Sequence, residues 1–122
     1  MLSKERILEL LELVNSALAE RSEIGEIVLV GGAVMCLVYD ARAATKDVGA
    51  IFEPSASIRK IVSDIARERG LADDWLNDVV KGFIVPGFQR ESVLMLSHLR
   101  VWATRTALHA RHEMHKRSLG YK

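Results

Sequence analysis

The sequence predicts a small α/β (α+β) fold in which helices pack on a short mixed sheet. Three observations support this prediction: a helical apolar periodicity near the N-terminus, two short β-branched segments, and an amphipathic stretch after the second of them. Helices and strands interleave without internal repeats or a low-complexity linker. A chain of 122 residues with this pattern is long enough for one domain with a real core.

The first predicted element is a helix that Ser3 can cap. Its apolar residues recur at spacings of three and four, and they are Ile7, Leu11, Val14 and Leu18. A stripe of this width indicates a helix that lies against a sheet or a partner.

Two strands are predicted next. Residues 26–30 are apolar on both faces, as expected for a central strand covered by helices. Gly31-Gly32 then turns the chain into a buried helix over residues 33–39. In the second strand, residues 47–52, alternation places Val48, Ala50 and Phe52 on one face and Asp47, Gly49 and Ile51 on the other.

Pro54 ends that strand, and either Ser55 or Ser57 can cap the following helix. The amphipathic stripe of this helix consists of Ile58, Ile61, Val62, Ile65 and Ala66. Gly70 is placed to end it.

A short helix is predicted after Gly70, with either Asp73 or Asp74 as its cap. It would run through Trp75, Leu76, Val79 and Val80 and stop at Gly82. Two further strands are predicted over residues 91–96 and 99–102, around Ser97-His98.

Composition narrows the class of protein. Hydrophobic residues make up 49% of the chain and charged residues 27%, which is ordinary for a globular domain. The net charge of +1 gives no strong signal for nucleic acid. Cys36 is the single cysteine, so no intramolecular disulfide can form, which suits a reducing cytosol. Without a signal-peptide pattern or a membrane-spanning run, we expect a cytoplasmic protein with no membrane partner.

The Gly-Gly turn and the strand that starts with Asp47 suggest a phosphate and metal chemistry. A Gly-Gly turn that opens a helix lets the main chain approach a phosphate and directs N–H groups at it. Two carboxylates at i and i+2 of a strand point to one face and can hold Mg²⁺, which prefers oxygen ligands. Position i+2 from Asp47 is Gly49, which has no side chain.

The features of this part of the chain follow in the order strand, Gly31-Gly32, apolar helix, Arg42, the Thr45-Lys46-Asp47 segment, apolar strand and Pro54. This order resembles the DNA polymerase beta-like nucleotidyltransferase superfamily. Residues 74–83 are similar to a motif of a minimal, uncharacterised bacterial branch related to toxin–antitoxin nucleotidyltransferases. The resemblance covers roughly residues 5–100. We therefore assign residues 1–102 to a nucleotidyltransferase-like domain and residues 103–122 to an atypical basic C-terminal tail.

The resemblance implies roles for particular residues. Gly31, Gly32, Arg42 and Lys46 would contact the nucleotide phosphates, and Asp47 would be the catalytic carboxylate and first Mg²⁺ ligand. Glu91, at the start of a predicted strand, is the best candidate for a further metal-binding carboxylate. Loss of one hard ligand at a shared metal site weakens binding severely. Asp47 has an alternative role as a strand-start carboxylate bonded to a backbone N–H or to Arg42.

Other residues have simpler interpretations. Asp73, Asp74 and Asp78 flank a short segment and suit capping and solvation better than metal binding. Cys36 is interpreted as a small buried hydrophobe rather than a nucleophile. Trp75 is interpreted as a core or partner-facing aromatic, as is Phe83.

The tail contains His109, His112 and His115, but we do not interpret them as a metal site. The resemblance ends near residue 102, where the family would continue with an Ala-Met-Lys-rich helix. Back-translated and read in another frame, residues 109–118 can encode such a helix. Our hypothesis is that residues from about 103 onward are a frameshifted, prematurely terminated tail.

Two classes of function remain open from the sequence. The first is a nucleotidyltransferase that moves a nucleoside monophosphate from NTP·Mg²⁺ to an unknown acceptor, with weak or no activity because of Gly49. The second is a degenerate, non-catalytic binding or partner module, such as a toxin–antitoxin component. A truncated sheet would also expose apolar surface and favour self-association.

Overall fold

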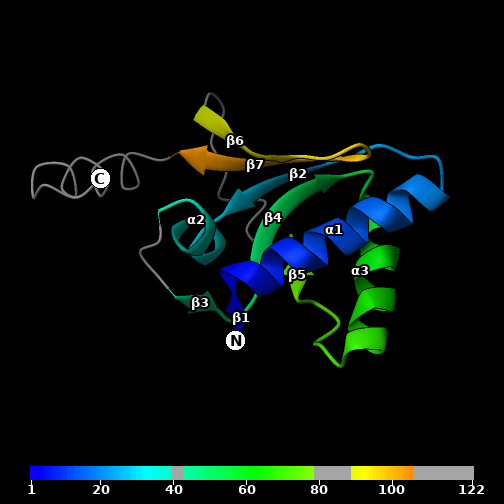
Figure 1. The fold of residues 1–122 in the computed structure, drawn as a ribbon, viewed down its shortest axis with the longest axis horizontal. Helices are drawn as coiled ribbons and strands as arrows, with labels where there is room; N and C mark the ends of the chain where they lie inside the picture. Colours follow the sequence, from blue (N-terminus) through cyan, green and yellow to red (C-terminus); the bar gives the residue numbers. More distant parts are fainter. Residues whose placement is uncertain (40–42, 79–88, 106–122) are drawn as a thin grey trace, which may run out of the picture.

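In the computed structural model, which describes residues 1–39, 43–78 and 89–105, three helices accompany a five-stranded mixed sheet (Figure 1). The described part of the chain therefore has an α+β architecture. The strands lie in the order β5-β4-β2-β7-β6. Their bounds are β2 (Gly25–Val30), β4 (Val48–Glu53), β5 (Leu76–Asn77), β6 (Gln89–Met95) and β7 (Leu99–Arg105). A separate two-stranded ribbon pairs β1 (Leu2–Ser3) with β3 (Ala44–Thr45).

The middle strand is β2, as predicted for residues 26–30. It pairs antiparallel with β4 on one side and parallel with β7 on the other. Val30 lies opposite Gly49 of β4, and Leu29 lies opposite both Ala50 and Ala103. The domain boundary expected after residue 102 thus falls within β7, whose Ala103 and Thr104 are buried.

The N-terminal helix α1 (Lys4–Glu20) confirms the predicted periodicity and cap. The Ser3 hydroxyl accepts a hydrogen bond from the backbone N–H of Arg6, at 3.2 Å. All four residues of the predicted stripe are buried, and Leu10 joins them. The short helix α2 (Gly32–Leu37) follows the Gly-Gly turn.

The helix α3 (Ser55–Arg69) buries the complete predicted stripe and ends at Gly70, which adopts a left-handed conformation. The predicted serine cap is wrong, because Pro54 is the capping residue and has no side-chain hydrogen bond. Ser57 lies inside the helix and donates instead to the Glu23 carboxylate, at 2.8 Å. The Ser57 hydroxyl, which the local sequence assigns to helix capping, is therefore bonded to a residue that is distant in the sequence.

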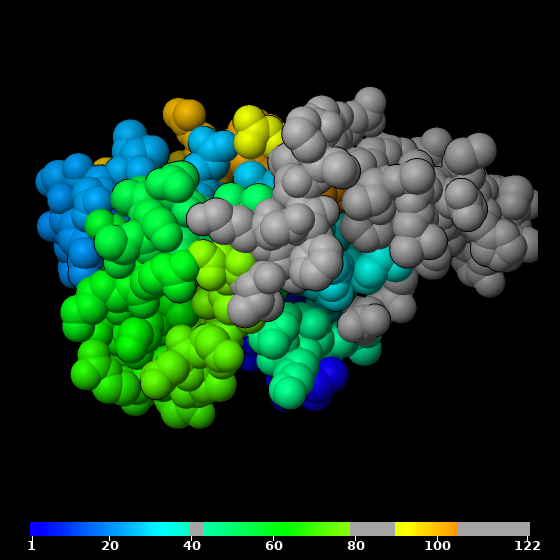
Figure 2. Space-filling view, turned by 180° about the vertical axis from the view of Figure 1, so that it is seen from behind, coloured from blue at the N-terminus to red at the C-terminus, as the bar shows by residue number. Residues whose placement is uncertain are grey.

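The short helix predicted after Gly70 is also wrong over its described residues. Leu76 and Asn77 form β5, which pairs in parallel with Val48 and Gly49 of β4. The Trp75 indole donates to the carbonyl of Val62 in α3, at 3.1 Å. Seen from behind, α3 (green) and the residues leading into β5 (yellow-green) form one flank of the molecule (Figure 2). Pairing with β4 decides the conformation of a segment too short for a helical period to be diagnostic. Val79, Val80, Gly82 and Phe83 lie outside the described residues.

The two faces of the sheet differ. Buried residues of all three described helices join one core with Ile27, Leu29, Ala50, Val101 and Ala103 of the sheet. Val48 and Phe52 belong to the same core, so the predicted alternation along β4 is confirmed. Val28 and Val30 point to the other face and are not part of this core. No helix in residues 1–39, 43–78 and 89–105 is long and apolar enough to cross a membrane.

Candidate functional site

The turn between β2 and α2 depends on Gly31. Its backbone has φ 64° and ψ −137°, a conformation essentially restricted to glycine. Apart from its two chain neighbours, no atom of the described residues lies within 4 Å of where a Cβ would stand, so the requirement is conformational rather than steric. The Gly31 carbonyl accepts from the N–H groups of Val34 and Met35, at 3.1 and 3.3 Å. The chain can therefore leave the strand and enter α2 with no intervening loop.

The sheet register places this turn beside the start of β4. Because Val30 lies opposite Gly49, the residues that follow Val30 run next to those that precede Gly49. Lys46 and Asp47 are exposed there, just ahead of the first strand residue. The buried Thr45 donates its hydroxyl to the Asp47 carbonyl, at 3.1 Å, which orders this approach. The structure thus brings Gly31, Gly32, Lys46 and Asp47 to one end of the sheet.

Gly49 lies within β4, between Val30 of β2 and Asn77 of β5. Strand alternation places position 49 on the face opposite to the core residues Val48 and Ala50. The neighbouring Asn77 side chain donates to the carbonyl of Asp74, at 3.1 Å. A side chain added at position 49 would therefore project from the sheet face opposite the described helices.

The structure does not bring Glu91 to Asp47. Glu91 of β6 shares a row with Ala103, Leu29 and Ala50, and so lies on the helix-covered face. Its carboxylate accepts a hydrogen bond from the hydroxyl of Tyr39, at 3.4 Å.

Strand order increases that separation. Two strands, β7 and β2, lie between β6 and β4, which places the backbones of β6 and β4 about 14 Å apart. A Mg²⁺ ion binds its ligands at about 2 Å and cannot span that distance on its own. Asp47 and Glu91 therefore do not form one metal site. Local sequence contains no information on strand order, so it could not have excluded this pair.

The structure describes some of the remaining candidate residues and not others. Arg42 and the tail histidines lie outside the described residues. Asp78 forms an ion pair with Arg59, and Asp73 is exposed. Cys36 is buried, as predicted. Within residues 1–39, 43–78 and 89–105, no group of three or more His, Cys, Asp or Glu side chains is arranged to hold a metal ion.

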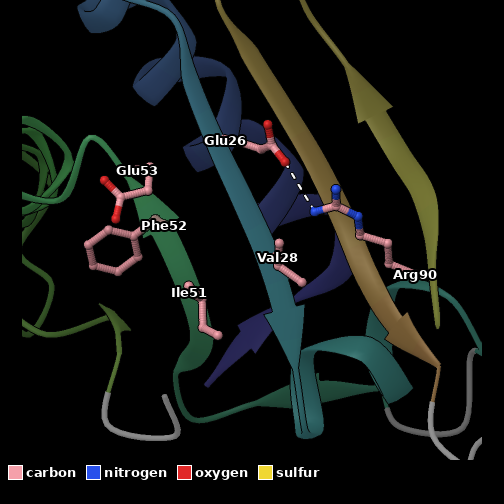
Figure 3. A pocket seen from close by; sticks show the side chains of 6 residues that line it. All are labelled: Glu26, Val28, Ile51, Phe52, Glu53 and Arg90. Atoms are coloured by element: carbon pink, nitrogen blue, oxygen red, sulfur yellow. Dashed lines mark hydrogen bonds and ion pairs between the residues drawn. The ribbon is translucent and has the colours of Figure 1, made fainter. Parts of the chain in front are cut away.

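One constellation was missed by the sequence reasoning. Arg90 of β6 reaches across β7 and bonds the Glu26 carboxylate, at 3.2 Å (Figure 3). Its guanidinium lies 4.9 Å from the centroid of the Trp102 ring. A shallow pocket of about 260 Å³ opens beside it, lined by Glu26, Val28, Ile51, Phe52, Glu53 and Arg90. The alternation of Trp102 with the core residues Val101 and Ala103 was the available signal that this ring faces away from the helices.

Comparison of the chain with protein-family models, with curated proteins and with solved structures finds no match.

Proposed function

We propose that this chain is a nucleotidyltransferase-fold protein with an impaired site, which retains the glycine turn and one carboxylate and lacks the second. The register of β2 and β4 supports the proposal most strongly, because it sets Gly31-Gly32 beside Asp47. The sequence resemblance requires these two features to be neighbours, although they are separated by a helix and a loop. The acceptor of any transferred nucleotide is unspecified.

In this proposal the turn and the exposed Lys46 contact the phosphates, and Asp47 provides a carboxylate toward Mg²⁺. The residues present do not fit a complete two-metal site. Position 49 has no side chain, and Glu91 lies on the other face of the sheet. We therefore derive no transfer step for this chain and expect at most weak nucleotide binding.

A thermal-shift titration tests the proposal. Each NTP is titrated with Mg²⁺ against the natural chain, against Gly49→Asp, and against Gly49→Asp combined with Asp47→Asn. A ligand that binds only the folded state raises the melting temperature. We expect a shift that is small in the natural chain, larger in Gly49→Asp and lost again in the double variant. Equal responses from all three proteins would reject a site at residues 47 and 49.

A second candidate is a non-catalytic module that binds a protein partner, such as a toxin–antitoxin component. The observation that favours it is the sheet face opposite the described helices, where Trp102 and Ile51 remain partly exposed. If no NTP shifts the melting temperature of any variant, while the product of an adjacent gene forms a stoichiometric complex with the chain, this candidate replaces the first.

A further inference from the structure

The sheet face opposite the described helices contains a row of opposite charges. Arg100 of β7, Glu26 of β2 and Glu53 of β4 lie side by side in register. Glu26 is bonded to Arg90. Arg100 and Glu53 are exposed, and neither has an ion-pair partner within the part of the chain that the structure describes. A cation and an anion, neither paired with another described residue, therefore flank β2 at equal distance.

The next row on the same face is apolar. Trp102 of β7, Val28 of β2 and Ile51 of β4 are aligned by the same register. Trp102 and Ile51 are partly exposed, whereas Val28 is 7% exposed. This row also has β2 at its centre, with a large apolar side chain on each side.

The outer residues of these two rows are self-complementary under a two-fold rotation about an axis parallel to β2, whereas Val28 and Glu26, which is bonded to Arg90, lie at the axis and meet their own copies. Such a rotation sets β7 of one copy over β4 of the other, at the same height along the strands. The Arg100 of each copy then meets the other copy's Glu53, and each Trp102 meets an Ile51. Isologous contacts of this kind are the commonest way in which identical chains associate.

We propose that a second copy of this chain packs on this sheet face, with Arg100 of each copy paired to Glu53 of the other. Two sheets that pack face to face lie about 10 Å apart, a gap that the apolar row fills and that arginine and glutamate side chains can bridge. Contact between the copies removes the apolar row from water and pairs two charges that have no ion-pair partner among residues 1–39, 43–78 and 89–105 of one copy.

Charge reversal tests the pairing directly, with oligomeric state measured by sedimentation velocity over a hundredfold range of concentration. We expect the natural chain to form a dimer as concentration rises. Glu53→Arg alone and Arg100→Glu alone should be monomeric over the same range. An equimolar mixture of the two variants should recover the dimer, because each mixed pair restores both salt bridges. Retained circular dichroism of each variant shows that folding is intact.

Glu12→Arg is the matched control, since Glu12 is an exposed carboxylate on α1, among the described helices that cover the other face. It should leave the dimer unchanged. The proposal is overturned by a natural chain that stays monomeric throughout, by single variants that still dimerise, or by a mixture that does not.

Discussion

Val30 of β2 and Gly49 of β4 lie directly opposite each other, one residue before the glycine turn on the first strand and two residues after Asp47 on the second. The pair connects two distant parts of the sequence at one end of the sheet. It also defines the defect in the candidate site, because position 49 is the first residue of β4 that faces away from the core and could add a second carboxylate beside Asp47.

The turn itself can be tested through stability. Gly31→Ala should lower the free energy of unfolding by about 1–3 kcal/mol, because an alanine must adopt the φ 64°, ψ −137° conformation. Gly70 offers a matched comparison, with φ 67° and ψ 36° in the left-handed helical region that asparagine tolerates. Urea unfolding should show that asparagine is better tolerated at position 70 than at position 31. Equal effects of asparagine at the two positions would contradict this description of the turn.

The sequence predicted the parts of the fold that depend on local periodicity. A single helix or strand contains the whole repeat that decides which of its residues are buried. This applies to the apolar stripes of α1 and α3 and to the alternation of Val48, Ala50 and Phe52. The cap of α3 and the conformation of Leu76 were wrong, because in each case a tertiary partner overrides a local preference.

The sequence could predict only the part of the candidate site that lies on two adjacent strands. Asp47 and the glycine turn flank one antiparallel pair, so a prediction of neighbouring strands was enough to place them together. Excluding Glu91 from the site required the order of four strands and the sheet face on which the register of β6 places its side chain. Neither can be derived from residue spacing.

Trp75 links β5 to α3. Because its ring is 2% exposed and its indole N–H donates to the Val62 carbonyl, Trp75→Phe should lose the hydrogen bond, worth about 1 kcal/mol, and some packing. Trp75→Ala should lower the free energy of unfolding by about 3–5 kcal/mol. Chemical denaturation measures both. A loss below about 0.5 kcal/mol for the alanine variant would show that Trp75 is not part of the core.

Trp102 should respond differently. Its indole N–H is buried and has no hydrogen-bond partner in the part of the chain that the structure describes. Trp102→Phe keeps an aromatic ring beneath Arg90 and removes that unsatisfied donor, so we expect stability within about 1 kcal/mol of the natural chain. Trp102→Ala should be clearly less stable than Trp102→Phe. Thermal unfolding of the monomeric Glu53→Arg background separates this effect from any change in association.

Asp64 of α3 should titrate below its ordinary pKa of 3.8. The hydrogen bond from Lys60, at 2.9 Å, lowers the pKa most, and the bond from Arg67 lowers it further. Because the folded-state pKa is depressed, the stabilisation is present above pH 3.8 and is lost as the pH falls through the lowered value. Carbon-detected NMR titration should show the pKa of Asp64 rising in Lys60→Met. An unchanged pKa in that variant would remove Lys60 as the main cause.

The most direct test of the proposed site is calorimetric titration of a non-hydrolysable NTP with Mg²⁺ into the natural chain and into Gly49→Asp. A restored carboxylate should tighten binding at least tenfold, with one site per chain, and Asp47→Asn in the Gly49→Asp background should abolish the gain. If Gly49→Asp folds normally and binds the nucleotide no better than the natural chain does, the proposed relationship between the glycine turn and the carboxylate strand is wrong.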